Sequence, residues 1–259
     1  MRVLVCVKEV PDLEGPIKVD RRGQWVELDR SIPFRMNRYD EFAVEEALLV
    51  KQSHPGVCVD IVSVGPPRSS AVIRRSLGMG ADHGIHVVTE DAGYSSPFET
   101  AYRIAAVVGD RSYDVIFAGV MAEDDMQGQV GPMLGELLSL PCATGVVLEH
   151  VSPKSSTVYV ERELEGGFKQ ALELRLPALL TIQTGINKPR YPSLSNMLRA
   201  NRQDLETINA RSSELPEWRE RVTRTGYPLK RRSCVVLRGS SQEKAAELLR
   251  ILREKSLLT

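Results

Sequence analysis

A polar loop rich in glycine, residues 118–132, carries the side chains most able to do chemistry in this chain. It holds two neighbouring carboxylates, Asp124 and Asp125, and two amides, Gln127 and Gln129. Carboxylates can bind Mg²⁺ or act as an acid–base pair, and amides can both donate and accept hydrogen bonds. The loop follows a short apolar run and precedes another apolar segment. That order is typical of a buried strand, a connecting loop and a helix.

The helix that we expect after this loop offers a place for an anion. The first N–H groups of a helix have no intrahelical partner and can hold a phosphate. Gly119, Gly128 and Gly131 would let the backbone approach a ligand closely. The same residues also fit an ordinary strand-to-helix connection, in which acidic side chains favour the start of the helix. We predict a binding role for the loop and no catalytic residue.

Further strand ends are expected beside the loop. Residues 6–8 and 64–66 each end an apolar run, and residues 37–40 directly precede the first expected helix. In an open α/β sheet, ligands bind outside the carboxyl ends of the strands. The convergence of these segments therefore predicts a nucleotide pocket.

The spacing of apolar residues predicts an α/β fold with a doubly wound, mainly parallel sheet. Strands are expected at residues 2–7, 57–64, 84–88 and 114–118. Helices are expected at residues 40–52, 68–77 and 97–108, and from about residue 127. The next strand-like runs, at 145–151, 157–163, 168–176 and 178–183, would extend the sheet in antiparallel fashion or form a small flanking sheet.

The C-terminal part of the chain differs in character. Residues 211–234 are polar with little periodicity, and a final amphipathic helix is predicted at residues 242–255. We therefore expect an α/β nucleotide-binding domain over residues 1–208 and a C-terminal arm over residues 209–259. Such an arm would bury its apolar side on a partner subunit or fold back on its own domain.

Composition narrows the class of protein. Lys plus Arg and Asp plus Glu are both 34, so no global field favours nucleic acid as a partner. No apolar run is long enough to insert into a membrane, and the N-terminal run is too short for a signal peptide, so we expect a cytoplasmic protein. The four cysteines lie far apart and the histidines lack ligand spacing, which predicts no metal site and a reducing compartment.

Several enzyme classes lack their motifs. The first strand is not followed by G-x-G-x-x-G, and neither a P-loop nor a G-x-S-x-G elbow occurs. An adenylating enzyme of similar topology would need a Ser/Gly-rich pyrophosphate loop, which is also missing. A stand-alone adenine-nucleotide-binding module or sensor remains the alternative to the interpretation that follows.

Five motifs occur in an order that resembles the beta subunit of electron transfer flavoproteins. They are residues 3–8 (VLVCVK), 37–47 (NRYDEFAVEEA), 78–82 (GMGAD), 129–132 (QVGP) and 189–197 (PRYPSLSNM). The resemblance covers residues 1 to about 208, and the final helix also fits. It implies a sheet like that of the adenine nucleotide alpha-hydrolases and a heterodimer with a flavin-bearing alpha subunit. Electrons would pass from flavin dehydrogenases to a quinone reductase or another acceptor.

The resemblance also implies an adenine-nucleotide site in this subunit, alongside FAD in the heterodimer. The expected cofactor-binding residues are Cys6, Val7, Lys8, Asn37, Asp40, Val64, Gly65, Gly119, Asp124, Asp125, Gln127, Gly128, Gln129, Val130, Gly131 and Pro132. The expected docking residues for partner dehydrogenases are Tyr191, Leu194 and Met197, with Leu194 as the apolar anchor.

The family divides into a class that holds AMP in this site and a class that holds a second FAD and can bifurcate electron pairs. Residues 129–132 and 39–40 resemble the two-flavin class. Residues 124–128 read DDMQG, which matches neither class, and Arg38 replaces the usual proline. The sequence leaves AMP and a second FAD as alternatives.

Overall fold

The computed structural model of the protein describes residues 1–12, 18–21, 23, 25–27, 32–90, 94–210, 220, 222–227 and 234–257. The chain forms two compact units, Met1–Thr225 and Gly226–Thr259. The predicted domain boundary at residue 208 falls inside a strand of the first unit. Most of the polar stretch 211–234 lies outside the described residues, which in this stretch are 220, 222–227 and 234.

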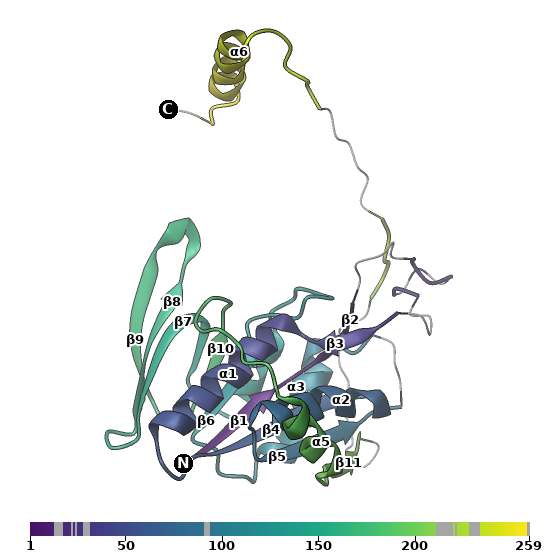
Figure 1. The fold of residues 1–259 in the computed structure, drawn as a ribbon, viewed down its shortest axis with the longest axis vertical. Coiled ribbons are helices and arrows are strands. Elements are labelled where there is room, and N and C mark those ends of the chain that lie inside the picture. The colour runs from purple at the N-terminus through teal and green to yellow at the C-terminus, as the bar shows by residue number, and fades with distance from the viewer. Residues whose placement is uncertain are drawn as a thin grey trace. The chain divides into compact units, whose positions relative to one another are not determined.

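The first unit is built on a nine-stranded sheet in the order β11-β5-β4-β1-β6-β10-β7-β8-β9 (Figure 1). The strands are β1 (Arg2–Cys6), β4 (Cys58–Gly65), β5 (His83–Val88), β6 (Val115–Gly119), β7 (Cys142–Ser152), β8 (Thr157–Glu163), β9 (Lys169–Arg175), β10 (Ala178–Ile182) and β11 (Glu206–Asn209). Pairing is parallel from β11 to β7, and β8 and β9 add antiparallel strands. The predicted α/β class with antiparallel additions is confirmed.

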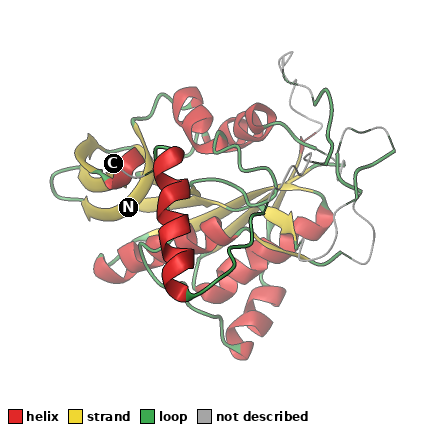
Figure 2. Ribbon diagram, turned by 90° about the horizontal axis from the view of Figure 1, so that it is seen from above, coloured by secondary structure: helices red, strands yellow, loops and turns green. Residues whose placement is uncertain are grey.

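Helices cover both faces of the sheet, as Figure 2 shows. Their bounds are α1 (Arg38–Ser53), α2 (Ser70–Met79), α3 (Pro97–Val108), α4 (Val130–Leu137) and α5 (Leu194–Arg202). One hydrophobic core joins α1, α2 and α5 to the sheet, and the other joins α3 and α4 to it. Successive residues of β1 alternate between these cores, since Val3 and Val5 belong to the first and Leu4 and Cys6 to the second. A strand buried on both faces must be apolar throughout, which explains its continuous run.

The strands after α4 join the main sheet and form no separate flanking sheet. The chain passes from β9 to β10, which inserts between β6 and β7 and runs parallel to both. The register of β7 against β10 shifts near Gly145, which has φ +70° and donates its N–H to the Thr181 hydroxyl at 3.1 Å. Beyond β7 the β8–β9 hairpin projects past the helices (Figure 1), joined by the short helix η2 (Glu165–Gly167).

Three short strands were missed by sequence analysis. β2 (Glu9–Pro11) pairs with β3 (Phe34–Met36) in a separate antiparallel sheet, and β11 adds to the edge of the main sheet beside β5. Each has three or four residues, too few to show a strand period.

The second unit contains helix α6 (Ser241–Glu254), whose start is fixed by a capping box. The Ser240 hydroxyl accepts the N–H of Glu243, and the Glu243 carboxylate accepts the N–H of Ser240. Leu248 and Leu249 on α6 are about half exposed within the chain. In the part of the chain that the structure describes, no helix combines the length and apolarity needed to cross a bilayer.

Candidate functional site

A cavity of about 230 Å³ lies where the carboxyl ends of β1, β4 and β6 meet the start of α4. β1 lies between β4 and β6, and the helices after β4 and β6 cover opposite faces of the sheet. The cavity therefore sits at the switch point of a doubly wound sheet, where such folds bind ligands.

The structure brings all but one of the predicted cofactor-binding residues to this cavity. Those that line it are Cys6, Val7, Lys8, Asn37, Asp40, Val64, Gly65, Gly119, Asp124, Asp125, Gln127, Gly128, Gln129, Val130 and Gly131. Pro132 does not line it. It stands at the third position of α4, and because proline has no N–H, it could not donate to an anion there.

Asp40 fastens the ends of β1 and β6 together. Its carboxylate accepts the N–H of Lys8 at 2.7 Å and the N–H of Gly119 at 3.1 Å. The residue is 5% exposed, and burial raises the pKa of its carboxyl to about 7 against these hydrogen bonds. A carboxylate on the first turn of α1 thus closes the base of the cavity.

Lys8 holds the acidic part of the loop. Its ammonium lies 2.8 Å from Asp124 and 3.0 Å from Asp125. Burial lowers the pKa of Lys8, but the two carboxylates outweigh that effect and leave it above the usual value. Both carboxylates are about nine-tenths covered, so they serve here to fix the loop on β1.

Asn37 ties the preceding part of the loop to the start of α1. Its side-chain amide donates to the carbonyl of Met121 at 2.9 Å, and its oxygen accepts the N–H of Glu123 at 3.1 Å. Arg35 forms an ion pair with Glu123 at 2.8 Å. The loop after β6 is therefore held by side chains from two distant segments, Lys8 and residues 35–37.

α4 begins at Val130, three residues later than expected. Two left-handed residues, Met126 with φ 53° and Gly128 with φ 64°, keep the preceding segment out of the helix. Gln129, the residue before α4, makes no side-chain capping hydrogen bond, and no other described residue caps this helix. The N–H groups of Val130 and Gly131 therefore have no acceptor within the helix, and both residues line the cavity.

The glycines of the site are explained mainly by packing within the protein. A Cβ on Gly119 would lie 2.3 Å from the Asp40 carboxylate, and one on Gly131 would lie 2.4 Å from the Thr181 methyl group. Close approach to a ligand was the expected reason for both. Only Gly128, with its positive φ, is required by the conformation of the loop itself.

Sequence analysis missed the aromatic rim of the cavity. The rings of Trp25 and Tyr94 lie 4.8 Å apart, and the Gln127 amide donates to the Tyr94 hydroxyl at 3.0 Å. Arg68 lies over the Phe34 ring and pairs with Glu9 at 2.8 Å. The remaining unanticipated lining residues are Pro11, Val26, Ser69, Thr89, Ser95, Pro97, Thr100 and Ile104, whereas Pro66, Ala118 and residues 120–122 belong to the strand ends and the loop already predicted.

The signal for this rim was weak. Its residues come from irregular segments and from the start of α3, where no hydrophobic period marks the side chains that face the cavity.

The three predicted docking residues differ in exposure. Tyr191 and Leu194 are 86% and 77% exposed. Met197, by contrast, packs on α2. Its sulfur lies so close to Gly78 that a Cβ added there would be only 2.4 Å away. α5 is anchored to the domain by Met197 and the buried Ala200, while Leu194 at its first turn remains available.

The fold and the cavity together define a doubly wound α/β protein with a ligand cavity at the switch point. The family model "Electron transfer flavoprotein domain" matches residues 24–213. The chain belongs to the electron transfer flavoprotein family, and its role is electron transfer.

Individual relatives extend this match to nearly the whole chain. The chain is 32% identical over 262 residues to electron transfer flavoprotein subunit beta of Methylophilus methylotrophus, covering 98% of each chain. It is 36% identical over 212 residues to the subunit of the same name from Mus musculus, covering 81% of this chain and 82% of that one. It is also 32% identical over 210 residues to the caffeyl-CoA reductase-Etf complex subunit CarD of Acetobacterium woodii, covering 81% of this chain and 78% of that one.

Proposed function

We propose that this chain holds an adenine nucleotide in the cavity between β1, β4, β6 and α4, within a heterodimer whose alpha subunit carries FAD. The heterodimer accepts electrons from flavin dehydrogenases and passes them to a quinone reductase or another acceptor. One observation carries the proposal: segments far apart in the sequence meet at a single cavity, at the place where this fold binds ligands.

The residues present fit an adenine nucleotide. The Trp25 and Tyr94 rings at the rim offer a surface on which a planar base can stack. The uncapped N–H groups at the start of α4 offer donors for a phosphate. Lys8 is already paired with two carboxylates, so phosphate recognition depends on these backbone groups rather than on Lys8.

A bound nucleotide has one of two roles, depending on its identity. AMP would be a structural ligand, whereas a second FAD would supply a further redox centre and allow electron bifurcation. In both cases the protein groups at the cavity position the adenine half and require no catalytic acid or base.

Two apolar surfaces fit the proposed partners. Leu194 and Tyr191 at the start of α5 form an exposed apolar site for a partner dehydrogenase. Helix α6 of the second unit buries its apolar face, including Leu248 and Leu249, on the alpha subunit.

The test is to purify the full chain with its co-purifying subunit, denature the complex and quantify the released FAD and AMP. One FAD and one AMP would identify the cavity ligand as AMP, and two FAD would identify it as a second flavin. Recovery of neither nucleotide, with no co-purifying subunit, would overturn the proposal and favour a stand-alone module.

A cavity-filling variant assigns the nucleotide to this site. Thr100 on α3 lines the cavity, so Thr100→Trp should release the cavity nucleotide and leave the FAD of the partner subunit in place. Ala106→Trp, on an exposed position of the same helix, is the matched control and should keep both nucleotides. Full retention of both nucleotides in Thr100→Trp would place the nucleotide elsewhere.

A further inference from the structure

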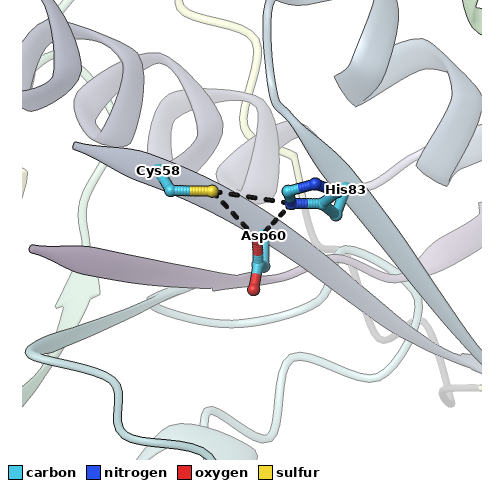
Figure 3. A group of neighbouring side chains, drawn as sticks. All are labelled: Cys58, Asp60 and His83. Carbon is cyan, nitrogen blue, oxygen red and sulfur yellow. Dashed lines mark hydrogen bonds and ion pairs between the residues drawn. The ribbon is translucent and has the colours of Figure 1, made fainter. Parts of the chain in front are cut away.

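A second group of side chains able to bind a metal or a ligand lies at the N-terminal ends of the parallel strands, opposite the nucleotide cavity. Cys58 and Asp60 are two residues apart on β4 and therefore point to the same face. His83 is the register partner of Asp60 on β5. Figure 3 shows the thiol, the carboxylate and the imidazole converging from these two strands.

The three ligand atoms lie close to the separations found around a single metal ion, with the N···O pair slightly nearer. Cys58 Sγ is 3.5 Å from both Asp60 Oδ1 and His83 Nδ1, and the nitrogen and oxygen are 3.1 Å apart. Bonds of the lengths that Zn²⁺ makes to S, N and O, arranged tetrahedrally, separate the ligand atoms by about 3.3 to 3.6 Å. Hydrogen bonding alone gives similar distances, so the surroundings of the group must decide.

The second oxygen of Asp60 accepts hydrogen bonds from outer side chains, as is usual for a carboxylate that binds a metal. Oδ2 accepts the Tyr113 hydroxyl at 2.8 Å and the Arg2 guanidinium at 2.6 Å. These contacts leave Oδ1 turned toward Cys58 and His83. Outer hydrogen bonds of this kind orient the ligands of metal sites.

The local charge also favours a divalent cation. A cavity of about 220 Å³ adjoins the group and is lined by three carboxylates, Asp60, Asp204 and Glu206, and two guanidiniums, Arg2 and Arg111. The thiolate that forms on metal binding adds another negative charge, which leaves two negative charges uncompensated. Asp60 and His83 both line this cavity, so solvent can reach an ion held by their side chains.

We propose that Cys58, Asp60 and His83 form a binding site for Zn²⁺ or a similar borderline transition metal, with the fourth position taken by water. A thiolate, an imidazole and a carboxylate together select such an ion over Mg²⁺ or Ca²⁺, which prefer oxygen ligands. Binding links the first residues of β4 and β5 and releases the thiol proton. The site is separate from the nucleotide cavity, because it lies at the opposite ends of the parallel strands.

The test uses the full chain after chelation, titrated with Co²⁺ as a spectroscopic probe and then with Zn²⁺ as a competitor. We expect one Co²⁺ per chain, a thiolate-to-cobalt charge-transfer band, and loss of that band when Zn²⁺ is added. Cys58→Ser should abolish the band, and His83→Gln should weaken binding. Tyr113→Phe removes an outer hydrogen bond and should lower the affinity roughly 10- to 100-fold.

Two control variants separate this site from adventitious binding. Cys234→Ser removes an exposed thiol of the second unit, and His54→Gln removes a histidine just after α1. Both should leave the Co²⁺ titration unchanged. Absence of the band in the wild-type chain, or a band that survives Cys58→Ser, would overturn the proposal. Circular dichroism of each variant confirms that a lost band does not reflect unfolding.

Discussion

The buried carboxylate of Asp40 should make the stability of this protein depend on pH in a defined direction. The side chain accepts two backbone N–H groups, from Lys8 at 2.7 Å and Gly119 at 3.1 Å, yet burial raises the pKa of its carboxyl from 3.8 to about 7. The folded protein therefore binds this proton more tightly than the unfolded chain does.

The size of the effect follows from linkage between protonation and folding. The shift from 3.8 to about 7 is roughly three pKa units, and each unit corresponds to about 1.4 kcal/mol, which gives a total of about 4 kcal/mol. Because the folded pKa is the higher one, this stabilising contribution is complete below about pH 4. It is lost as the pH rises to about 7, where the carboxylate ionises in the folded state.

The assay is urea unfolding of the nucleotide-free full chain at several pH values between about pH 4 and pH 8. Asp40→Asn removes the titration, although its amide oxygen can accept from only one of the two N–H groups, which costs about 1–3 kcal/mol relative to the protonated wild type. The unfolding free energy of wild type minus that of Asp40→Asn should therefore fall by about 4 kcal/mol across this range and change sign, from about 1–3 kcal/mol near pH 4 to about −1 to −3 kcal/mol near pH 8.

Asp110→Asn, in the exposed turn after α3, controls for the loss of a carboxylate as such. Parallel pH profiles for wild type and Asp40→Asn would refute the argument that burial dominates the titration of Asp40. A difference that grows with pH would show that the two N–H groups outweigh burial.

Three further predictions concern the same loop and the docking surface. Gly119→Ala should cost about 3 kcal/mol in urea unfolding, since the new methyl group would lie 2.3 Å from the Asp40 carboxylate; a cost below about 1 kcal/mol would contradict the packing. Lys8→Met should cost about 2 kcal/mol and weaken nucleotide binding by equilibrium dialysis, because two loop carboxylates lose their cation; unchanged binding would show that the loop holds its shape alone. Leu194→Ala should slow electron transfer from a partner dehydrogenase at limiting concentration and change unfolding by less than about 0.5 kcal/mol, because the side chain is 77% exposed; an unchanged rate would remove Leu194 from docking.

The sequence by itself determined the class of fold and most of the elements. The continuous apolar run of β1 required a strand covered on both faces, and the apolar stripe of α3 predicted its bounds as they stand, Pro97–Val108. The position of the cavity followed as well, because the carboxyl ends of parallel strands must meet at one edge. The burial of an element determines the spacing of its apolar residues along the chain. Strands and helices can therefore be predicted from that spacing, and the position of the cavity follows from the order of the strands and helices.

Only the tertiary structure decided which distant groups pair. Lys8 binds Asp124 and Asp125, which lie more than a hundred residues away in the sequence. The two carboxylates, which by sequence could have bound a metal or acted as an acid–base pair, therefore hold the loop in place. The left-handed conformation of Met126 delays the start of α4, although no residue preference at that position signals it.

The thiol, carboxylate and imidazole at the opposite edge illustrate the same limit. Cys58 and His83 are 25 residues apart, a spacing that matches no metal motif, and they meet because β4 and β5 pair with Asp60 opposite His83. Strand order and register are set by the packing of the whole sheet, because each strand can pair with several others and only the complete sheet selects its neighbours. A local pattern of residues therefore shows which segments become strands, while the side chains that they bring together are fixed only when the sheet has formed.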